Sequence, residues 1–415
     1  MKHFSIKPAQ LEFLDWEMGI FFHFGIRTFY EGHKDWDMKE MPLSGFNPTA
    51  LDCRQWIATA KQAGFTYAIL VTKHHDGFAN WPSAYTEYSV KNTPWKDGKG
   101  DVVREFTDAC RELGMKVGLY YSPAQFGSTQ MQGKEYDDYF VNQIGELLTN
   151  YGKIDYLWFD GCGSEGHKYD SARIISEIRR MQPEILLFDM WDPDTRWGCN
   201  EAGIASMPNR NIIDEPEISH QIKNDPPINR TLFLPVECDF RMRRKNWFYS
   251  DTDEDTVKSL AELMGIYEYS VGRGANLLLN IGPDRRGLLP EKDAARLLEF
   301  GEEIRRRYGA PMISVKDPEG VLGNYAVDLE DYTLIDRVVL TEDITEGEKI
   351  TDVKVSVCPT FSNTPVLVSH NFSVGHKLIA TFPPISTKHI RIRVEGRADA
   401  RLDRIDIIRA VPTRL

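Results

Sequence analysis

Short apolar runs alternate with segments of helical spacing over the first three quarters of the chain, and this alternation limits the possible folds most strongly. The intervening segments, such as LDCRQWIATAKQAG and DVVREFTDACRELG, carry apolar residues on one face and end in glycine, a helix stop signal. Apolar strands that alternate with amphipathic helices indicate a parallel sheet covered by helices on both faces. The apolar runs are MGIFFHFG, FTYAILVTKHHDG, MKVGLYYSP, IDYLWFDG, EILLFDM, TLFLPVECD and GANLLLNIGPD.

The number of apolar runs favours a closed barrel over an open sheet. About seven strand-like runs over roughly 300 residues fit an eightfold (β/α)8 TIM-like barrel with insertions. An open sheet that binds a dinucleotide carries G-x-G-x-x-G after its first strand, and no such motif follows the first apolar run here. We therefore predict an α/β fold of the barrel type.

The pattern changes after about Ser314, where β-branched runs such as YTLIDRVVLTEDI, HKLIATF and KHIRIRVEG follow one another between turn residues. No helical pattern interrupts them, which indicates an all-β sandwich of roughly one hundred residues. The chain has 415 residues, more than one hydrophobic core usually serves. We predict two domains, a catalytic barrel over residues 1–313 and a C-terminal β-sandwich over residues 314–415.

Composition excludes several classes of partner. The net charge of -12 argues against nucleic acid or an anionic membrane as a partner. No apolar stretch approaches the ~18 residues of a membrane span. The N-terminus lacks a signal-peptide pattern, so we expect a cytoplasmic protein as written, or a periplasmic or secreted one if a leader was removed. The cysteines form no C-x-x-C pair and no histidine spacing is typical of a metal site, so we expect no metal or other cofactor.

Polar residues stand at the carboxyl end of each apolar run. In a (β/α)8 barrel the active site is built at that end, from several strands at once. Taken singly, such residues have ordinary explanations, since Asp160-Gly161 alone is typical of a turn. Their recurrence at every run favours an active site. The residues are His23, Lys73, His74, His75, Asp76, Tyr120, Tyr121, Asp160, Asp189, Glu237, Asp239, Asn280 and Asp284.

Carboxylates, histidines and aromatics without a nucleotide or metal motif are what a glycosidase requires: one ionised carboxylate as nucleophile and one carboxylic acid for the leaving group. Asp160, at a strand end, suits the nucleophile, and both Glu201 and Glu237 are candidates for the acid. Trp36 and Trp81 lie in polar loops, where an exposed ring suits a sugar. A carbohydrate-binding protein without catalysis is an alternative, although it need not keep both carboxylates.

Longer motifs extend along nearly the whole chain, and in them the sequence resembles family 29 of the glycoside hydrolases, the retaining α-L-fucosidases. The C-terminal IDRVVLTEDITEGEKI resembles the galactose-binding-like sandwich found in many of these enzymes. The chain departs from the family in having Asp35-Trp36 where Glu-Trp is frequent, and in lacking Pro-Gly before Trp247. The motifs include WEMGIFFHFGIRTF, FNPTALDCRQWIATAKQAGFTYAILVTKHHDGFANWPS, LLTNYGKIDYLWFDG, RWGCNEAGIA and SVGRGANLLLNIGPDRRG.

The resemblance implies a role for each matching residue. Asp160 would be the nucleophile, and Glu201 would be the acid/base because it stands in RW-x-x-NE-x-G-x-A, a motif of the subgroup that prefers branched α-1,3/1,4-linked fucose. Glu237 would support the site and is the second candidate for the acid. The substrate would be a fucosylated oligosaccharide or glycoconjugate; a broad or α-1,2 preference, or another sugar, is the alternative. The residues lining the sugar pocket would be His23, Trp36, His74, His75 and Tyr120.

Overall fold

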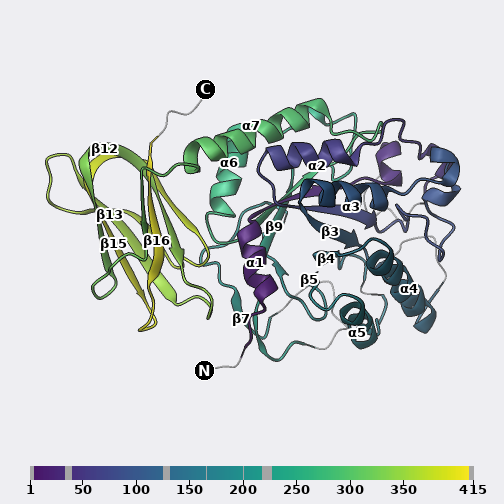
Figure 1. The fold of residues 1–415 in the computed structure, drawn as a ribbon, viewed down its shortest axis with the longest axis horizontal. Coiled ribbons are helices and arrows are strands. Elements are labelled where there is room, and N and C mark those ends of the chain that lie inside the picture. Colours follow the sequence, from purple (N-terminus) through teal and green to yellow (C-terminus); the bar gives the residue numbers. More distant parts are fainter. Residues whose placement is uncertain are drawn as a thin grey trace.

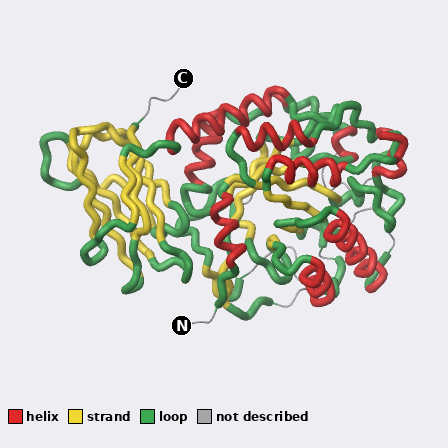
Figure 2. The backbone as a smooth tube through the Cα atoms, viewed as in Figure 1, coloured by secondary structure: helices red, strands yellow, loops and turns green. Residues whose placement is uncertain are grey.

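Eight parallel strands form the central sheet of the computed structural model, in the order β5-β4-β3-β2-β1-β10-β9-β6 (Figures 1 and 2). An isolated parallel bridge joins Phe188 of β5 to Thr195, which directly precedes β6, so the two edge strands meet and the sheet is a nearly closed barrel. The strands are β1 (Met18–Phe22), β2 (Tyr67–Lys73), β3 (Lys116–Tyr121), β4 (Tyr156–Phe159), β5 (Leu186–Phe188), β6 (Arg196–Trp197), β9 (Val236–Arg241) and β10 (Asn276–Ile281). The structure describes residues 4–32, 40–124, 131–164, 166–199, 201–216 and 227–410.

Helices surround this sheet, as the amphipathic segments predicted (Figure 1). The carboxylates of Asp52, Asp101 and Asp170 accept backbone N–H groups at the first turns of α2, α3 and α5. Helix α3 ends at Gly114, whose φ of 67° is the left-handed conformation that glycine adopts without strain. The helices are α1 (Pro8–Trp16), α2 (Cys53–Gln62), α3 (Val102–Leu113), α4 (Lys134–Asn150), α5 (Ser171–Met181), α6 (Leu260–Tyr269) and α7 (Glu291–Tyr308).

Both faces of the barrel strands are buried, which explains their continuous apolar sequences. In β2, Tyr67, Ile69 and Val71 belong to the aromatic cluster inside the barrel, whereas Ala68 and Leu70 belong to the core under the helices. Successive residues of a strand point to opposite faces, so each strand contributes to both cores. The predicted barrel is confirmed.

Helix α1 closes the amino-terminal end of the barrel. The ring of Phe13 lies 5.9 Å from that of Tyr67 and 5.3 Å from that of Tyr156, and Trp16 lies 5.5 Å from Tyr67, measured between centroids. The side-chain amide of Asn276 donates to the carbonyl of Phe13 at 2.7 Å. With this end filled, the interior of the barrel can open to solvent at the carboxyl ends of the strands.

The C-terminal part is a six-stranded antiparallel sheet in the order β11-β16-β12-β15-β13-β14, and the predicted all-β fold is confirmed. The runs HKLIATF and KHIRIRVEG, predicted as separate strands, both lie in the 19-residue strand β15, whose pairing with β12 contains register shifts. The strands are β11 (Ile313–Lys316), β12 (Asn324–Glu342), β13 (Ile350–Pro359), β14 (Val366–Asn371), β15 (Leu378–Gly396) and β16 (Leu402–Arg409). A small antiparallel hairpin, β7 (Ile212–Asp214) and β8 (Thr231–Phe233), completes the strands of the described residues.

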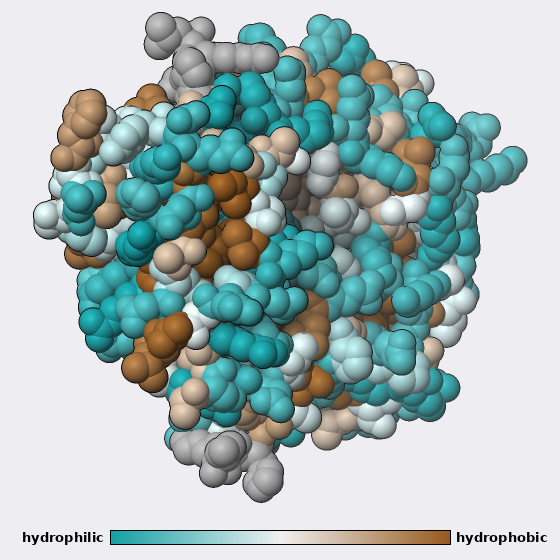
Figure 3. Space-filling model, turned by 60° about the vertical axis from the view of Figure 1, so that its left-hand side comes forward, coloured by the Kyte–Doolittle hydropathy of each residue, from teal (hydrophilic) through white to brown (hydrophobic). Residues whose placement is uncertain are grey.

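The two parts contact each other through α6 and the turn that follows it. The carboxylate of Glu268 lies 2.9 Å from the guanidinium of Arg337 in β12, and the backbone N–H of Ile379 donates to the carbonyl of Gly272 at 2.8 Å. The molecular face turned forward in Figure 3 is mainly hydrophilic, with hydrophobic side chains gathered in patches between the polar ones. Among the described residues no helix combines the length and the apolar character that crossing a bilayer requires.

Candidate active site

A pocket of about 200 Å³ opens at the carboxyl ends of the barrel strands. It brings together side chains that follow or end strands far apart in the sequence, from β1 to β9, which is the arrangement of an active site in this type of barrel. Trp81 and Glu237 are predicted site residues that do not line it, and Trp36 lies outside the described residues. The predicted residues that line it are His23, His74, His75, Tyr120, Asp160 and Glu201.

Asp160 directly follows β4, and its carboxylate accepts hydrogen bonds on both oxygens. The hydroxyl of Tyr120 donates to Oδ2 at 2.8 Å, and the backbone N–H of Cys162 donates to Oδ1 at 2.9 Å. His75 Nε2 lies 3.4 Å from Oδ2. Burial raises the pKa of Asp160, but the charge of His75 and these hydrogen bonds outweigh it and hold the pKa at about 2. The carboxylate is therefore ionised at neutral pH, with 27% of its side chain exposed to the pocket.

His75 is the cationic partner of Asp160. Burial lowers the pKa of its imidazole, but the carboxylate of Asp160 outweighs burial and raises the pKa to about 9. Its Nδ1 lies 2.6 Å from the hydroxyl of Ser122. This contact orients the ring so that Nε2 faces the carboxylate.

His23 and His74 are neutral, in contrast to His75. Burial lowers the pKa of His23 to about 3, and lowers the pKa of His74 well below its usual value. His23 Nδ1 lies 2.7 Å from the side-chain oxygen of Asn280, while Nδ1 of His74 has no hydrogen-bond partner within the described part of the chain. A buried polar atom without a partner is costly, so His74 is suited to meeting a hydroxyl of a bound molecule.

Glu201 lies in the loop after β6, with a side chain 46% exposed. Its φ of 59° is in the left-handed region, which is uncommon for a residue other than glycine and frequent at functional sites. Burial raises the pKa of its carboxyl, Arg241 opposes this, and the charge of Asp160 adds to it. A carboxyl group with a raised pKa beside an ionised one is the pattern of an acid and a nucleophile.

Glu237 lies deeper, inside the barrel, and is 1% exposed. Tyr67 donates its hydroxyl to Oε2 at 2.5 Å, and the indole of Trp158 donates to Oε1 at 2.8 Å. Burial raises the pKa of Glu237 to about 8, which favours its protonated form near pH 7. Since Trp158 lines the pocket, Glu237 contacts the pocket wall from behind and does not reach the pocket itself.

Comparison with known proteins agrees with this geometry. Residues 2–307 match the model of the alpha-L-fucosidase family. The chain belongs to this family. It is 40% identical to alpha-L-fucosidase 1 of Arabidopsis thaliana over 304 residues, which are 70% of this chain and 58% of the plant protein.

Solved structures of the family extend the likeness over the whole fold. A glycoside hydrolase 29 family member from an unknown rumen bacterium superimposes with a TM-score of 0.90 at 31% identity, over 99% of this chain and 78% of that one. The crystal structure of SpGH29 superimposes with a TM-score of 0.88 at 30% identity, over 99% of both chains. The family's barrel and C-terminal sheet are thus both present in this fucosidase-family chain.

Trp81 is a residue for which the sequence interpretation and the structure differ. It is 1% exposed, and its indole donates to Glu146 of α4 at 2.8 Å, behind the pocket wall. The aromatic surface of the pocket comes instead from Trp158, Trp197 and Trp247. Trp158 stacks on Phe188 with 4.0 Å between centroids.

Two carboxyl groups to which the sequence assigned no role also line the pocket, Asp189 and Asp239. Both hold Trp197: its backbone N–H donates to Asp189 Oδ1 at 3.2 Å, and its indole donates to Asp239 Oδ1 at 2.7 Å. Burial raises the pKa of Asp189 well above its usual value and raises the pKa of Asp239 to about 6. Both stand at the ends of apolar runs, which had placed them among the candidates for an active site without a specific role.

Proposed function

We propose that this protein is a retaining exo-α-L-fucosidase. The observation that carries the proposal is the ionised carboxylate of Asp160 at the barrel mouth, in one pocket with the carboxyl of Glu201, whose pKa is raised. Retaining glycosidases use two carboxyl groups in these states. Family membership makes α-L-fucose the sugar, and we propose a fucosylated oligosaccharide or glycoconjugate as the substrate.

The proposed reaction is a double displacement. Asp160 attacks the anomeric carbon of fucose while Glu201 gives its proton to the departing glycosidic oxygen, so that a fucosyl-aspartate ester forms. Glu201, now ionised, takes a proton from water as the water attacks the same carbon, and L-fucose and Asp160 are released. His23 and His74 would bind fucose hydroxyls, and Trp158 and Trp247 would pack against the apolar face of the ring.

We further propose a preference for α-1,3/1,4 linkages over α-1,2. This finer assignment is supported by the RW-x-x-NE-x-G-x-A motif, which begins in β6 and continues into the loop that carries Glu201. Initial rates on matched α-1,2- and α-1,3/1,4-fucosylated oligosaccharides test it, and faster cleavage of the α-1,2 substrate would overturn it.

We also propose a domain boundary between residues 313 and 314. It is supported by β11, the first strand of the C-terminal sheet, which begins at Ile313.

The decisive experiment compares three carboxyl variants on 4-nitrophenyl α-L-fucoside. Asp160→Asn should lose at least about 10³-fold in kcat, because the amide keeps the shape of the carboxylate but is not a nucleophile. Glu201→Ala should keep most of its kcat/KM on this good leaving group but lose about 10²-fold in kcat/KM on a fucosylated oligosaccharide, since an acid matters most for a poor leaving group. Its kcat on the aryl fucoside should fall, because Glu201 also activates the water of the second step. Turnover by Asp160→Asn at the wild-type rate would end the proposal.

Glu237→Gln serves as the matched control, because the amide keeps the shape and neutral state of the buried acid. The kcat/KM of this variant should stay within about threefold of the wild-type value on both substrates. If Glu237→Gln and not Glu201→Ala shows the leaving-group dependence, the two glutamates exchange roles. A panel of aryl glycosides tests whether another sugar is cleaved faster than fucose.

A further inference from the structure

Strand β9 carries three charged or titratable side chains at alternate positions, Glu237, Asp239 and Arg241. Alternate residues share one face of a strand, so the three form a series that rises from the barrel interior to its mouth. Glu237 lies behind Trp158, Asp239 lines the pocket, and Arg241 is 26% exposed at the rim.

Arg241 contacts the two loops that flank the pocket at this rim. Its Nη2 lies 3.9 Å from Glu201 Oε2, in the loop after β6. Its guanidinium carbon lies 5.1 Å from the ring centroid of Trp247, in the loop after β9, and Nη1 donates to the carbonyl of Lys245 at 3.4 Å. Trp247 in turn packs against His23, with 5.0 Å between centroids.

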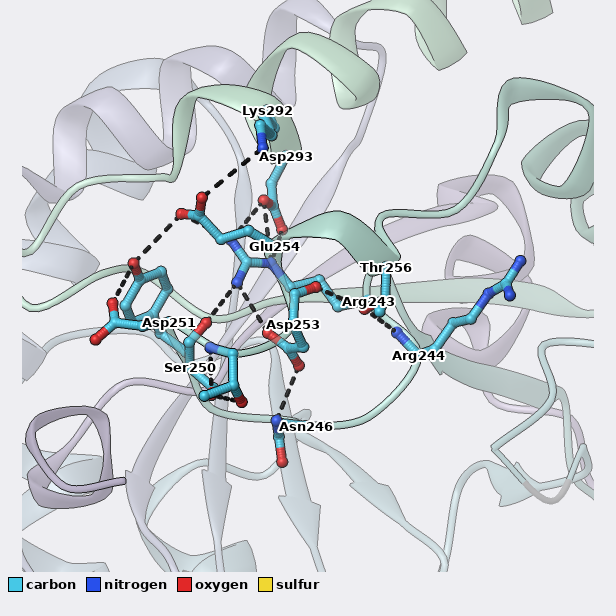
Figure 4. Close-up of polar contacts among 12 residues, drawn as sticks. Arg243, Arg244, Asn246, Ser250, Asp251, Asp253, Glu254, Thr256, Lys292 and Asp293 are labelled. Atoms are coloured by element: carbon cyan, nitrogen blue, oxygen red, sulfur yellow. Dashed lines mark hydrogen bonds and ion pairs between the residues drawn. The ribbon is translucent and has the colours of Figure 1, made fainter. Parts of the chain in front are cut away.

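A second arginine, within the loop after β9, fixes this loop to the neighbouring elements (Figure 4). Arg243 is buried and donates from Nη2 to Asp293 at 2.8 Å and from Nη1 to Asp253 at 3.0 Å. Nη1 also donates to the carbonyl of Ser250 at 2.9 Å, and Asn246 donates to Asp253 at 2.9 Å. Arg241 therefore connects the Glu201 loop to a loop that is itself firmly held.

Charged groups from several elements face this contact. Glu201 is influenced by Arg241, by Asp160 at the end of β4 and by Asp239 in β9. In addition to burial, the positive charge of Arg241 lowers the pKa of Lys258 and of His23. Within the described part of the chain, no other cation lies within salt-bridge distance of Glu201.

We propose that Arg241 is a positioning residue for the acid/base: its guanidinium, seated on Trp247, holds the Glu201 loop so that the carboxyl faces the glycosidic oxygen opposite Asp160. The inference rests on the proposed function. Because a small misplacement of a catalytic group is costly, this contact governs proton donation and leaves the attack by Asp160 intact.

The test compares Arg241→Met, Arg241→Lys and the control Arg244→Met. Arg244 extends away from the cluster in Figure 4, and its side chain is 68% exposed. Arg241→Met should lose about tenfold in kcat/KM on a fucosylated oligosaccharide and less than about threefold on 4-nitrophenyl α-L-fucoside. Arg241→Lys should recover part of the loss, and Arg244→Met should match the wild type on both substrates.

The pH profile supplies a second readout that a purely structural role would not move. The guanidinium lowers the pKa of Glu201, so its removal raises that pKa. The basic limb of kcat/KM, which reports loss of the acid's proton, should move to higher pH in Arg241→Met and stay in place in Arg244→Met.

Equal losses on both substrates, or an unmoved basic limb, would overturn the inference. Thermal unfolding of each variant identifies a loss caused by misfolding, in which case Arg241→Lys decides by the leaving-group dependence alone, since lysine keeps the positive charge. If the wild type fails to cleave fucosides or Asp160→Asn stays active, the proposed function fails. If the wild type cleaves fucosides, Asp160→Asn is inactive and Arg241→Met shows no leaving-group dependence, only the positioning role fails.

Discussion

Asp160 and His75 form an ion pair whose members shift each other's pKa in opposite directions. The carboxyl has a pKa of about 2 and the imidazole one of about 9, so both are charged between those values. The depressed pKa of Asp160 adds stability at pH values above the ordinary aspartate pKa, and this is lost as pH falls toward 2. The raised pKa of His75 adds stability below the ordinary histidine pKa, and this is lost as pH rises through 9.

Replacing His75 should change the pH dependence of the reaction. In His75→Gln the carboxyl of Asp160 keeps its burial but loses the neighbouring cation, so its pKa should rise. The acid limb of kcat/KM on 4-nitrophenyl α-L-fucoside should therefore move to higher pH. The neighbouring variant His74→Gln replaces a ring that is already neutral, so it should raise KM and leave the acid limb in place. An unmoved limb in His75→Gln would contradict the pairing.

At the scale of the element, the sequence predicted which residues stand near strand ends. It did not predict how deep in the barrel each of these residues lies. Parallel strands bring their carboxyl ends to one edge, so His23, His74, His75, Tyr120 and Asp160 could be expected in one pocket. The run TLFLPVECD placed Glu237 near a strand end, but β9 continues to Arg241. Four residues of strand put Glu237 roughly 13 Å deeper.

Trp81 illustrates a second limit, because the path of a loop is set by contacts distant in sequence. After β2 the chain turns back, and Ala79 forms an antiparallel bridge with Lys73. This reversal carries Trp81 to α4, where Glu146 accepts its indole N–H. A polar loop sequence is equally compatible with a path toward the pocket and a path toward α4. Composition alone therefore did not determine whether the ring of Trp81 faced the pocket.

The Arg243 network links the loop after β9 to the start of α7, and its removal should affect stability. Arg243→Met leaves Asp253 and Asp293 buried without their cation, which should cost about 3–5 kcal/mol in free energy of unfolding. Denaturant titration followed by tryptophan fluorescence measures this. Arg244→Met, next in sequence but exposed, should change the value by less than about 0.5 kcal/mol. Similar values for the two variants would show that the network adds little.

At the scale of the whole molecule, Glu268 joins the barrel to the C-terminal sheet. It accepts a hydrogen bond from Tyr308 at 2.7 Å and pairs with Arg337 at 2.9 Å and Arg307 at 3.3 Å. The sequence indicated both folds, since each has its own residue pattern. The surface between them could not be predicted, because it joins α6 to strands that follow it by dozens of residues.

Glu268→Gln should lower the free energy of unfolding by about 1–3 kcal/mol, since two arginines lose their charged acceptor. The pocket lies elsewhere on the barrel, so kcat should change less than about twofold. Chemical denaturation and aryl fucoside kinetics on the same preparation measure both. Glu299→Gln, which breaks an exposed pair with Arg296, should shift stability by less than about 0.5 kcal/mol. A large fall in kcat for Glu268→Gln would mean that the sheet influences catalysis.

The nearly closed barrel is joined between its two shortest strands, β5 and β6, which are three and two residues long. Three backbone hydrogen bonds cross this junction, between residues 187–189 and residues 194–195. Regions with few backbone hydrogen bonds open at low free energy. The loop that carries Glu201 leaves the barrel at this junction, whereas Asp160 follows a strand paired on both sides. We expect the bond to Asp160 to form at a site of fixed geometry. The defucosylated product should leave on the side of β5 and β6, where local opening costs the least free energy.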